Sequence, residues 1–186
     1  LLEQAETVLE KAGLVYPFVA KPDQGERGLG VCLMKDKNRL RKYLEAYPAG
    51  DVILFQELVH YPHEAAILYY RMPDDEVGNI PSMTIKHFPA IRGNGQHTLR
   101  ELIEADPRAR VMRSVYIERH AADAERVLED GELFDLVFTG NRAQGTIFTD
   151  GRNKITPELN TQIHEFVSSI PNFFFGRLDM RFRDMD

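Results

Sequence analysis

A lysine followed by a glycine-rich stretch is the first feature of the sequence that could do chemistry. Lys21 ends an apolar run, and Gly25, Gly28 and Gly30 follow it before a second apolar run begins. Glycines let backbone N–H groups approach an anion closely, and a lysine ammonium suits phosphate oxygens. The G-x-x-G-x-G spacing between two predicted strands is neither a P-loop nor a dinucleotide fingerprint. On spacing alone the stretch fits either a hairpin tip with a solvated lysine or a phosphate-binding flap.

The second such feature is a charged strand near the end of the sequence. Arg177, Asp179, Arg181 and Arg183 alternate with the apolar residues of 178–182. The period of two places one acid among three arginines on one face of a strand. An ion-paired strand face over the edge of the core is one interpretation, and an anion- or cation-binding face is the other.

Mixed strands and helices must position these residues, so the pattern predicts an α+β fold. Thr98 and Glu101 have capping-box spacing, and Thr156 with Pro157 fits the start of a helix. The apolar face of that last helix is predicted to be Leu159, Ile163, Phe166, Val167 and Ile170. Strands are predicted at 16–22, 30–34, 51–59, 64–72, 82–91, 132–140, 145–151 and 173–182, and helices at 5–12, 40–47, 97–105, 106–131 and 157–170.

Composition narrows the classes of function. The chain has 186 residues and a net charge of −6, which argues against nucleic acid as a partner. No apolar run reaches membrane-spanning length. Cys32 is the single cysteine, so an intrachain disulfide is excluded and a reducing, cytoplasmic location is expected. The sequence starts without Met and ends within a predicted strand and its turn, so we expect a piece of a longer protein.

Four stretches, in order along the chain, resemble the ATP-grasp enzymes. "ILFQELVHYPHEAAILYY" resembles their hinge, and "GNGQHTLRELI" and "NRAQGTIFTDGRNKITPEL" resemble segments of the cyanophycin synthetase-like, carboxylate–amine ligase branch. "FGRLDMRF" resembles the strand that carries a magnesium-binding aspartate in ATP-grasp ligases. The resemblance implies an ATP-grasp fold that is truncated at both ends. A small α+β lid would cover residues 1–55, and an incomplete larger α+β body would cover 56–186, with a helical insertion at about 92–131 and the nucleotide between lid and body.

The resemblance also implies roles for single residues. Lys21 and the backbone from Gln24 to Gly30, with Gly25 and Gly28, would cover the ATP phosphates. The adenosine-binding residues would be Gln56, Glu57 and Val59 at the hinge and Glu64 at the ribose. A half-exposed strand and a solvated turn are the respective alternatives.

Asp179 would bind Mg²⁺, a hard cation that prefers carboxylate and phosphate oxygens. Arg177 would clamp the transferring phosphoryl group, and Lys86 would be a second phosphate-binding lysine, with an ordinary surface lysine as the alternative. Arg92 would reach an anionic substrate. The family's further metal ligands, a Glu and an Asn on a following strand, are not in this sequence, so we expect the piece alone to be inactive.

The implied activity is ATP- and Mg²⁺-dependent ligation of a carboxylate to an amine through an acyl phosphate, with an amino acid or peptide as substrate. Two alternatives stay open: an ATP-binding regulatory module, favoured by Gln56 where the family usually has an acid, and an ATP-grasp phosphotransferase. Segments outside the sequence could support a homo-oligomer. The "HYPHE" stretch around His60 and His63 is a weak zinc candidate, because it lacks a helix to align its ligands.

Overall fold

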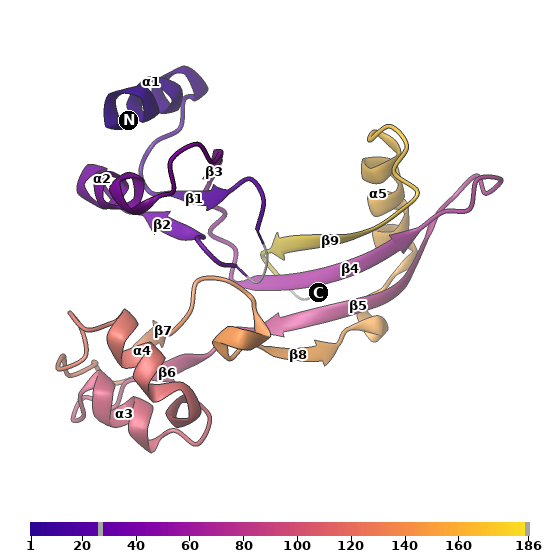
Figure 1. Ribbon diagram of the computed structural model, residues 1–186. Coiled ribbons are helices and arrows are strands. Elements are labelled where there is room, and N and C mark those ends of the chain that lie inside the picture. Colours follow the sequence, from indigo (N-terminus) through magenta and orange to yellow (C-terminus); the bar gives the residue numbers. More distant parts are fainter. Residues whose placement is uncertain (26–27, 185–186) are drawn as a thin grey trace. The chain divides into compact units, whose positions relative to one another are not determined.

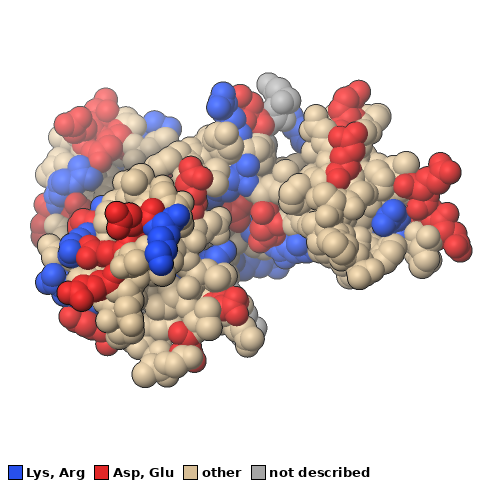
Figure 2. Space-filling view, turned by 90° about the horizontal axis from the view of Figure 1, so that it is seen from above, with Lys and Arg blue, Asp and Glu red and all other residues tan. Residues whose placement is uncertain are grey.

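The computed structural model describes residues 1–25 and 28–184 as two compact units, Leu1–His60 and the residues from Tyr61 onward (Figure 1). Antiparallel sheets combined with helices confirm the predicted α+β class. On the face seen in Figure 2, positive and negative side chains are intermixed. Among the described residues, no helix is both long and apolar enough to cross a membrane.

The first unit is a three-stranded antiparallel sheet with two helices. Its strand order is β2 (Cys32–Met34), β1 (Phe18–Pro22) and β3 (Ile53–Glu57). The helices are α1 (Leu2–Ala12), which ends at Gly13 with φ 65°, and α2 (Lys37–Ala46), which is capped by Asp36. Their apolar side chains join those of the sheet in a single core, composed of Ala5, Leu9, Phe18, Ala20, Met34, Leu40 and Leu44. The loop between β1 and β2 contains the glycine-rich stretch.

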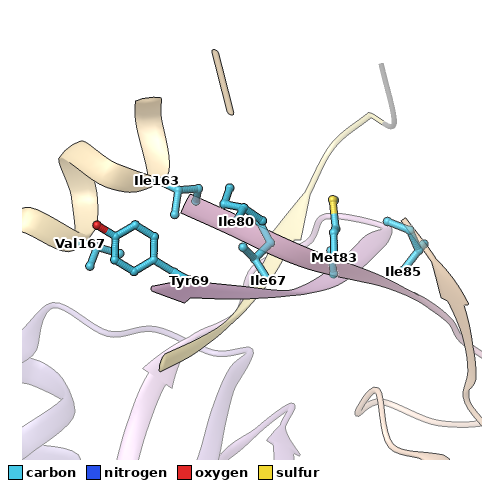
Figure 3. Packing of buried hydrophobic residues seen from close by; sticks show 8 residues of the cluster. Ile67, Tyr69, Ile80, Met83, Ile85, Ile163 and Val167 are labelled. Atoms are coloured by element: carbon cyan, nitrogen blue, oxygen red, sulfur yellow. The ribbon is translucent and has the colours of Figure 1, made fainter. Parts of the chain in front are cut away.

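The second unit is built on a four-stranded antiparallel sheet. Its order is β8 (Ile147–Asp150), β5 (Asn79–His87), β4 (His63–Tyr70) and β9 (Phe175–Phe182). The helix α5 (Pro157–Ser168) starts at the predicted cap Thr156 and packs on one face of this sheet. Figure 3 shows the core between them: Ile67, Tyr69, Ile80, Met83, Ile85, Ile163 and Val167. Because side chains alternate along a strand, the other face of these strands carries the polar residues.

A smaller body lies between β5 and β8 in the sequence. It contains β6 (Ala90–Arg92) paired with β7 (Leu133–Asp135), the helices α3 (Leu99–Ala105) and α4 (Arg113–Arg119), and the short 3-10 turn η1 (Ala109–Met112). The predicted capping box of Thr98 and Glu101 is present at the start of α3. Two further 3-10 turns follow, η2 (Arg142–Gln144) and η3 (Arg152–Lys154). This body has its own apolar core around Leu99, Ile103 and Tyr116.

Several predicted elements differ from the structure. The stretch 106–131 is helical only over 109–119, and its second half forms turns and a single bridge between Thr98 and Val127. The predicted strand 82–91 divides into β5 and β6 around Pro89, which has no N–H for a ladder. The predicted strand 132–140 is reduced to β7. Phe166 is 59% exposed, because the buried face of α5 is narrower than its apolar stripe.

Candidate active site

The polar face of the second unit's sheet gathers charged side chains from three neighbouring strands. Lys86 on β5 and Arg181 on β9 are both register partners of Glu64 on the central strand β4. Asp179 is the partner of Ala66, two residues further along β4. Side chains at paired positions point to the same face, so the register brings these groups together.

Lys86 is the centre of this cluster. Its Nζ atom lies 2.6 Å from Oε1 of Glu64 and 2.8 Å from Oδ2 of Asp179. The Lys86 side chain is 2% exposed, whereas the side chain of Glu64 is 11% and that of Asp179 is 51% exposed. A buried ammonium is tolerated only when it is paired and hydrogen-bonded, and the two carboxylates supply both conditions. The alternative that Lys86 is an ordinary surface lysine is therefore wrong.

Asp179 lies at the solvent-facing edge of the cluster. Its Oδ1 atom accepts a 2.8 Å hydrogen bond from Nε of Arg177, so the two residues share the strand face that the alternation predicts. Burial alone would raise the pKa of the Asp179 carboxyl, but the hydrogen bonds and charges of Lys86 and Arg177 outweigh it and hold this pKa below its usual range. Asp179 is therefore a carboxylate at neutral pH.

Arg181 anchors the far side of Glu64, a contact that the sequence did not indicate beyond placing Arg181 on this face. Its Nε atom lies 3.3 Å from Oε2 of Glu64, and its Nη2 donates to the backbone oxygen of Phe138 at 2.9 Å. The guanidinium lies over the rings of Phe88 and Phe138, at 5.0 and 5.6 Å from their centroids. Cation–π contacts of this kind stabilise a planar guanidinium. Arg181 is thus a fixed partner for Glu64.

The loop that follows β7 covers the Glu64–Lys86 pair. A Cβ on Gly140 would lie 2.6 Å from Oε1 of Glu64 and 2.7 Å from Cδ of Lys86, so only glycine fits without a shift. The loop is fixed further on, where the hydroxyl of Tyr116 donates to the backbone oxygen of Gln144 at 2.8 Å. The backbone of this loop is thus packed directly against the two charged side chains.

The first unit carries a separate group of candidate residues. Nζ of Lys21, on β1, donates to Oε1 of Gln56, on the adjacent strand β3, at 2.6 Å. Beside Lys21 is an open depression of about 260 Å³, whose lining includes Gly25, Gly28 and Leu54. A predicted phosphate-binding lysine and a predicted hinge residue are therefore in contact. The predicted flap contains residues 26 and 27, which lie outside the described residues.

Comparison with known proteins identifies the family. The family described as the RimK-like ATP-grasp domain matches residues 2–96, which is half of the chain. The chain belongs to this family. The ATP-grasp resemblance of the sequence motifs is thereby confirmed.

Two individual proteins are also similar to this RimK-like ATP-grasp chain. A cyanophycin synthetase from Geminocystis herdmanii (strain PCC 6308) is 26% identical over 198 residues, which cover 96% of the chain. The chain spans 22% of the length of that relative. A solved structure, a bifunctional glutathione synthetase from Pasteurella multocida, is 14% identical with a TM-score of 0.43, and the match covers 100% of this chain and 26% of that one.

The remaining predicted site residues of this ATP-grasp chain lie outside the Lys86 cluster, in the first unit and in the smaller body. Gln24, Glu57 and Val59 are exposed in the first unit. Arg92 ends β6 in the smaller body, where its Nη1 donates to the backbone oxygen of Gly131 at 3.2 Å. Within residues 28–184, no hydrogen bond or ion pair joins Arg92 to the Lys86 cluster. Its role as a contact for an anionic substrate stays a prediction.

The described part of this ATP-grasp chain offers few ligands to a metal ion. Residues 1–25 and 28–184 contain no group of three or more His, Cys, Asp or Glu side chains that could hold one. Asp179 fits as a single ligand, because its carboxylate is ionised and half exposed. Mg²⁺ is commonly bound through one or two carboxylates together with substrate phosphates, and this donor set fits that mode of binding.

Proposed function

We propose that the protein acts as an ATP-dependent ligase that joins a carboxylate to an amine, with an amino acid or peptide as a substrate. The observation that carries the proposal is the Lys86–Asp179–Arg177 group. It presents two cations and one ionised, half-exposed carboxylate on a single sheet face of a chain from the ATP-grasp family. Phosphoryl transfer is catalysed mainly by positioning and charge stabilisation, which this arrangement suits.

Each residue of the group has a distinct role in this proposal. Arg177 presents a guanidinium fork that can bind two phosphoryl oxygens at once, and Lys86 adds a compact positive charge beside it. Asp179 would hold Mg²⁺, which supplies further neutralisation of phosphate charge when it is bound. Arg177 is 54% exposed, so its guanidinium is accessible to a ligand.

The first unit would contribute nucleotide contacts of its own. Lys21 and the backbone at Gln24, Gly25, Gly28 and Gly30 would bind phosphate oxygens. Gln56, Glu57 and Val59 would form the adenine hinge through strand-end backbone groups. The ribose role of Glu64 stays a prediction, because its two carboxylate oxygens pair with Lys86 and Arg181 and its side chain is only 11% exposed. The exposure of Gln56 and Glu57 and the open depression beside Lys21 support the first-unit contacts. A nucleotide shared by the lid and the body stays a prediction.

The proposed reaction has two steps. An oxygen of the substrate carboxylate attacks the γ-phosphorus of ATP, the bond to the β,γ-bridging oxygen breaks, and ADP and an acyl phosphate form. The amine nitrogen then attacks the acyl carbon, phosphate leaves with the bonding electron pair, and the amine loses a proton to solvent. The amide, ADP and phosphate are the products.

Hydroxylamine trapping tests this function directly. The full-length protein is incubated with ATP, Mg²⁺, a panel of amino acids and short peptides, and hydroxylamine. Hydroxamate formation that matches ADP release, and that is lost in Arg177→Gln, is expected. A stable phosphorylated product without hydroxamate would instead identify a phosphotransferase. ATP binding without any ADP release across the panel would identify a regulatory module.

A further inference from the structure

Both carboxylate oxygens of Asp179 are held by cations of the chain itself. Oδ2 accepts from Nζ of Lys86 and Oδ1 accepts from Nε of Arg177, each at 2.8 Å. These contacts place two positive charges of the chain at the carboxylate. A divalent cation that approaches Asp179 therefore meets an already neutralised group and two like charges, which oppose its binding.

We infer that the ammonium of Lys86 occupies the position at Asp179 that a metal ion would take. Asp179 should therefore bind Mg²⁺ together with a nucleotide, and bind it poorly without one. The inference rests on the proposed function, since it assumes that phosphate is the group that draws the two cations away. Phosphate oxygens offer Lys86 and Arg177 an alternative anionic partner, and they also offer Mg²⁺ the further oxygen ligands that it needs. One ligand thus removes the block and completes the metal site.

The cluster is built so that Lys86 can leave Asp179 without losing its counter-ion. Glu64 holds Nζ of Lys86 from the other side, at 2.6 Å, and is itself held by Arg181 at 3.3 Å. Leaving a buried charge unpaired is strongly unfavourable, and the contact with Glu64 avoids that cost when the ammonium turns toward phosphate. Arg177 faces a smaller cost, because its side chain is half exposed.

A thermodynamic consequence follows from this arrangement. If nucleotide raises the affinity for the metal, the metal must raise the affinity for nucleotide by the same factor. Couplings between two sites typically amount to about 5–150-fold. Metal and nucleotide should therefore bind as a coupled pair, and removal of Lys86 should weaken the coupling by raising the affinity for metal alone.

Mn²⁺ binding measured by electron paramagnetic resonance tests the inference without reference to turnover. The full-length protein is titrated with Mn²⁺ alone and with Mn²⁺ plus a non-hydrolysable ATP analogue, as wild type, Asp179→Asn and Lys86→Gln. Lys154→Gln is the matched control, since Lys154 is the other lysine of the second unit and lies on the opposite face of the sheet, beside Met180 and Phe182. Lys86→Gln and Lys154→Gln are each also combined with Asp179→Asn. The Asp179-dependent signal is the Mn²⁺ binding of a protein minus that of the same protein with Asp179→Asn added.

We expect wild type and Lys154→Gln to bind Mn²⁺ at Asp179 weakly without nucleotide and more tightly with the nucleotide analogue. Lys86→Gln should bind Mn²⁺ without nucleotide, about tenfold or more tightly than wild type does. Asp179-dependent binding of Mn²⁺ to nucleotide-free wild type, unchanged in Lys86→Gln, would overturn the inference and leave the proposed metal role intact. Absence of Asp179-dependent binding in every protein, with and without nucleotide, would overturn both.

Discussion

The ammonium of Lys86 contacts the carboxylate of Asp179 across an intervening strand. The two residues are 93 positions apart, on β5 and β9, and β4 lies between these strands. At about 4.8 Å per strand spacing, the side chains bridge roughly 10 Å between backbones. Ala66 occupies this face of β4 opposite Asp179, and its small side chain leaves space for the contact.

The space over Ala66 leads to a first prediction. Ala66→Leu should place a branched side chain beside the Lys86–Asp179 contact, destabilise the fold by about 1–3 kcal/mol and reduce ATP turnover. Ala66→Ser, which keeps the side chain small, should retain turnover. Steady-state ADP release and thermal unfolding of the two variants check this, and wild-type turnover in a folded Ala66→Leu protein would show that the space is not required.

The close approach of Gly140 to the charged pair leads to a second prediction. Gly140→Ala would put a methyl group 2.6 Å from Oε1 of Glu64, so the loop or the pair must move. The expected loss in the free energy of unfolding is about 1–3 kcal/mol, measured by urea denaturation. Gly25→Ala is the control, because its nearest contact is an ordinary 3.7 Å. Equal stabilities of the two variants would argue against tight packing at Gly140.

Lys21 leads to a third prediction, which concerns the first unit alone. Lys21→Ala should remove a phosphate contact and lower ATP turnover of the full-length protein by about 100-fold. Lys11→Ala, at an exposed position in the last turn of α1, should leave turnover unchanged. Coupled-enzyme detection of ADP distinguishes the two. Turnover in Lys21→Ala equal to that of the control would exclude Lys21 from the site.

Glu132 leads to a prediction about pH. Hydrogen bonds from the Arg126 guanidinium, then from the backbone N–H of Glu129, hold the pKa of the Glu132 carboxyl below its usual range. A group whose pKa is lower in the folded state stabilises the fold above its unfolded pKa, and this stabilisation is lost as pH falls. Below about pH 4.3, the free energy of unfolding should fall more steeply in wild type than in Glu132→Gln. Parallel profiles from urea titrations at pH 3 to 6 would contradict this.

Local patterns predicted the elements that carry the site. The alternation along 177–183 placed Arg177 and Asp179 on one face, and the caps at Thr98 and Thr156 were confirmed. The helical prediction for 106–131 was wrong in its second half. Charged residues occur both in exposed helices and in solvated turns, so charge alone does not distinguish the two.

The contacts of the site depend on information that local patterns lack. The burial of Lys86 follows from the register of β5 and β9 on β4. This register brings Lys86 to Glu64, which is 22 positions away in the sequence, and to Asp179, which is 93 positions away. Arg181 acquires its role from Phe88 and Phe138, which come from loops outside its strand. Strand order and register depend on which faces are buried across the whole unit, so they cannot be read from local patterns along the chain.

The claim that this sheet face binds a magnesium–nucleotide complex is tested most directly by isothermal titration calorimetry. A non-hydrolysable ATP analogue is titrated into the full-length protein, as wild type and as Asp179→Asn, with Mg²⁺ and with EDTA. We predict that Mg²⁺ strengthens binding to wild type by about tenfold or more and has little effect on Asp179→Asn. Equal strengthening by Mg²⁺ in both proteins would contradict the assignment of Asp179 and the function built on it.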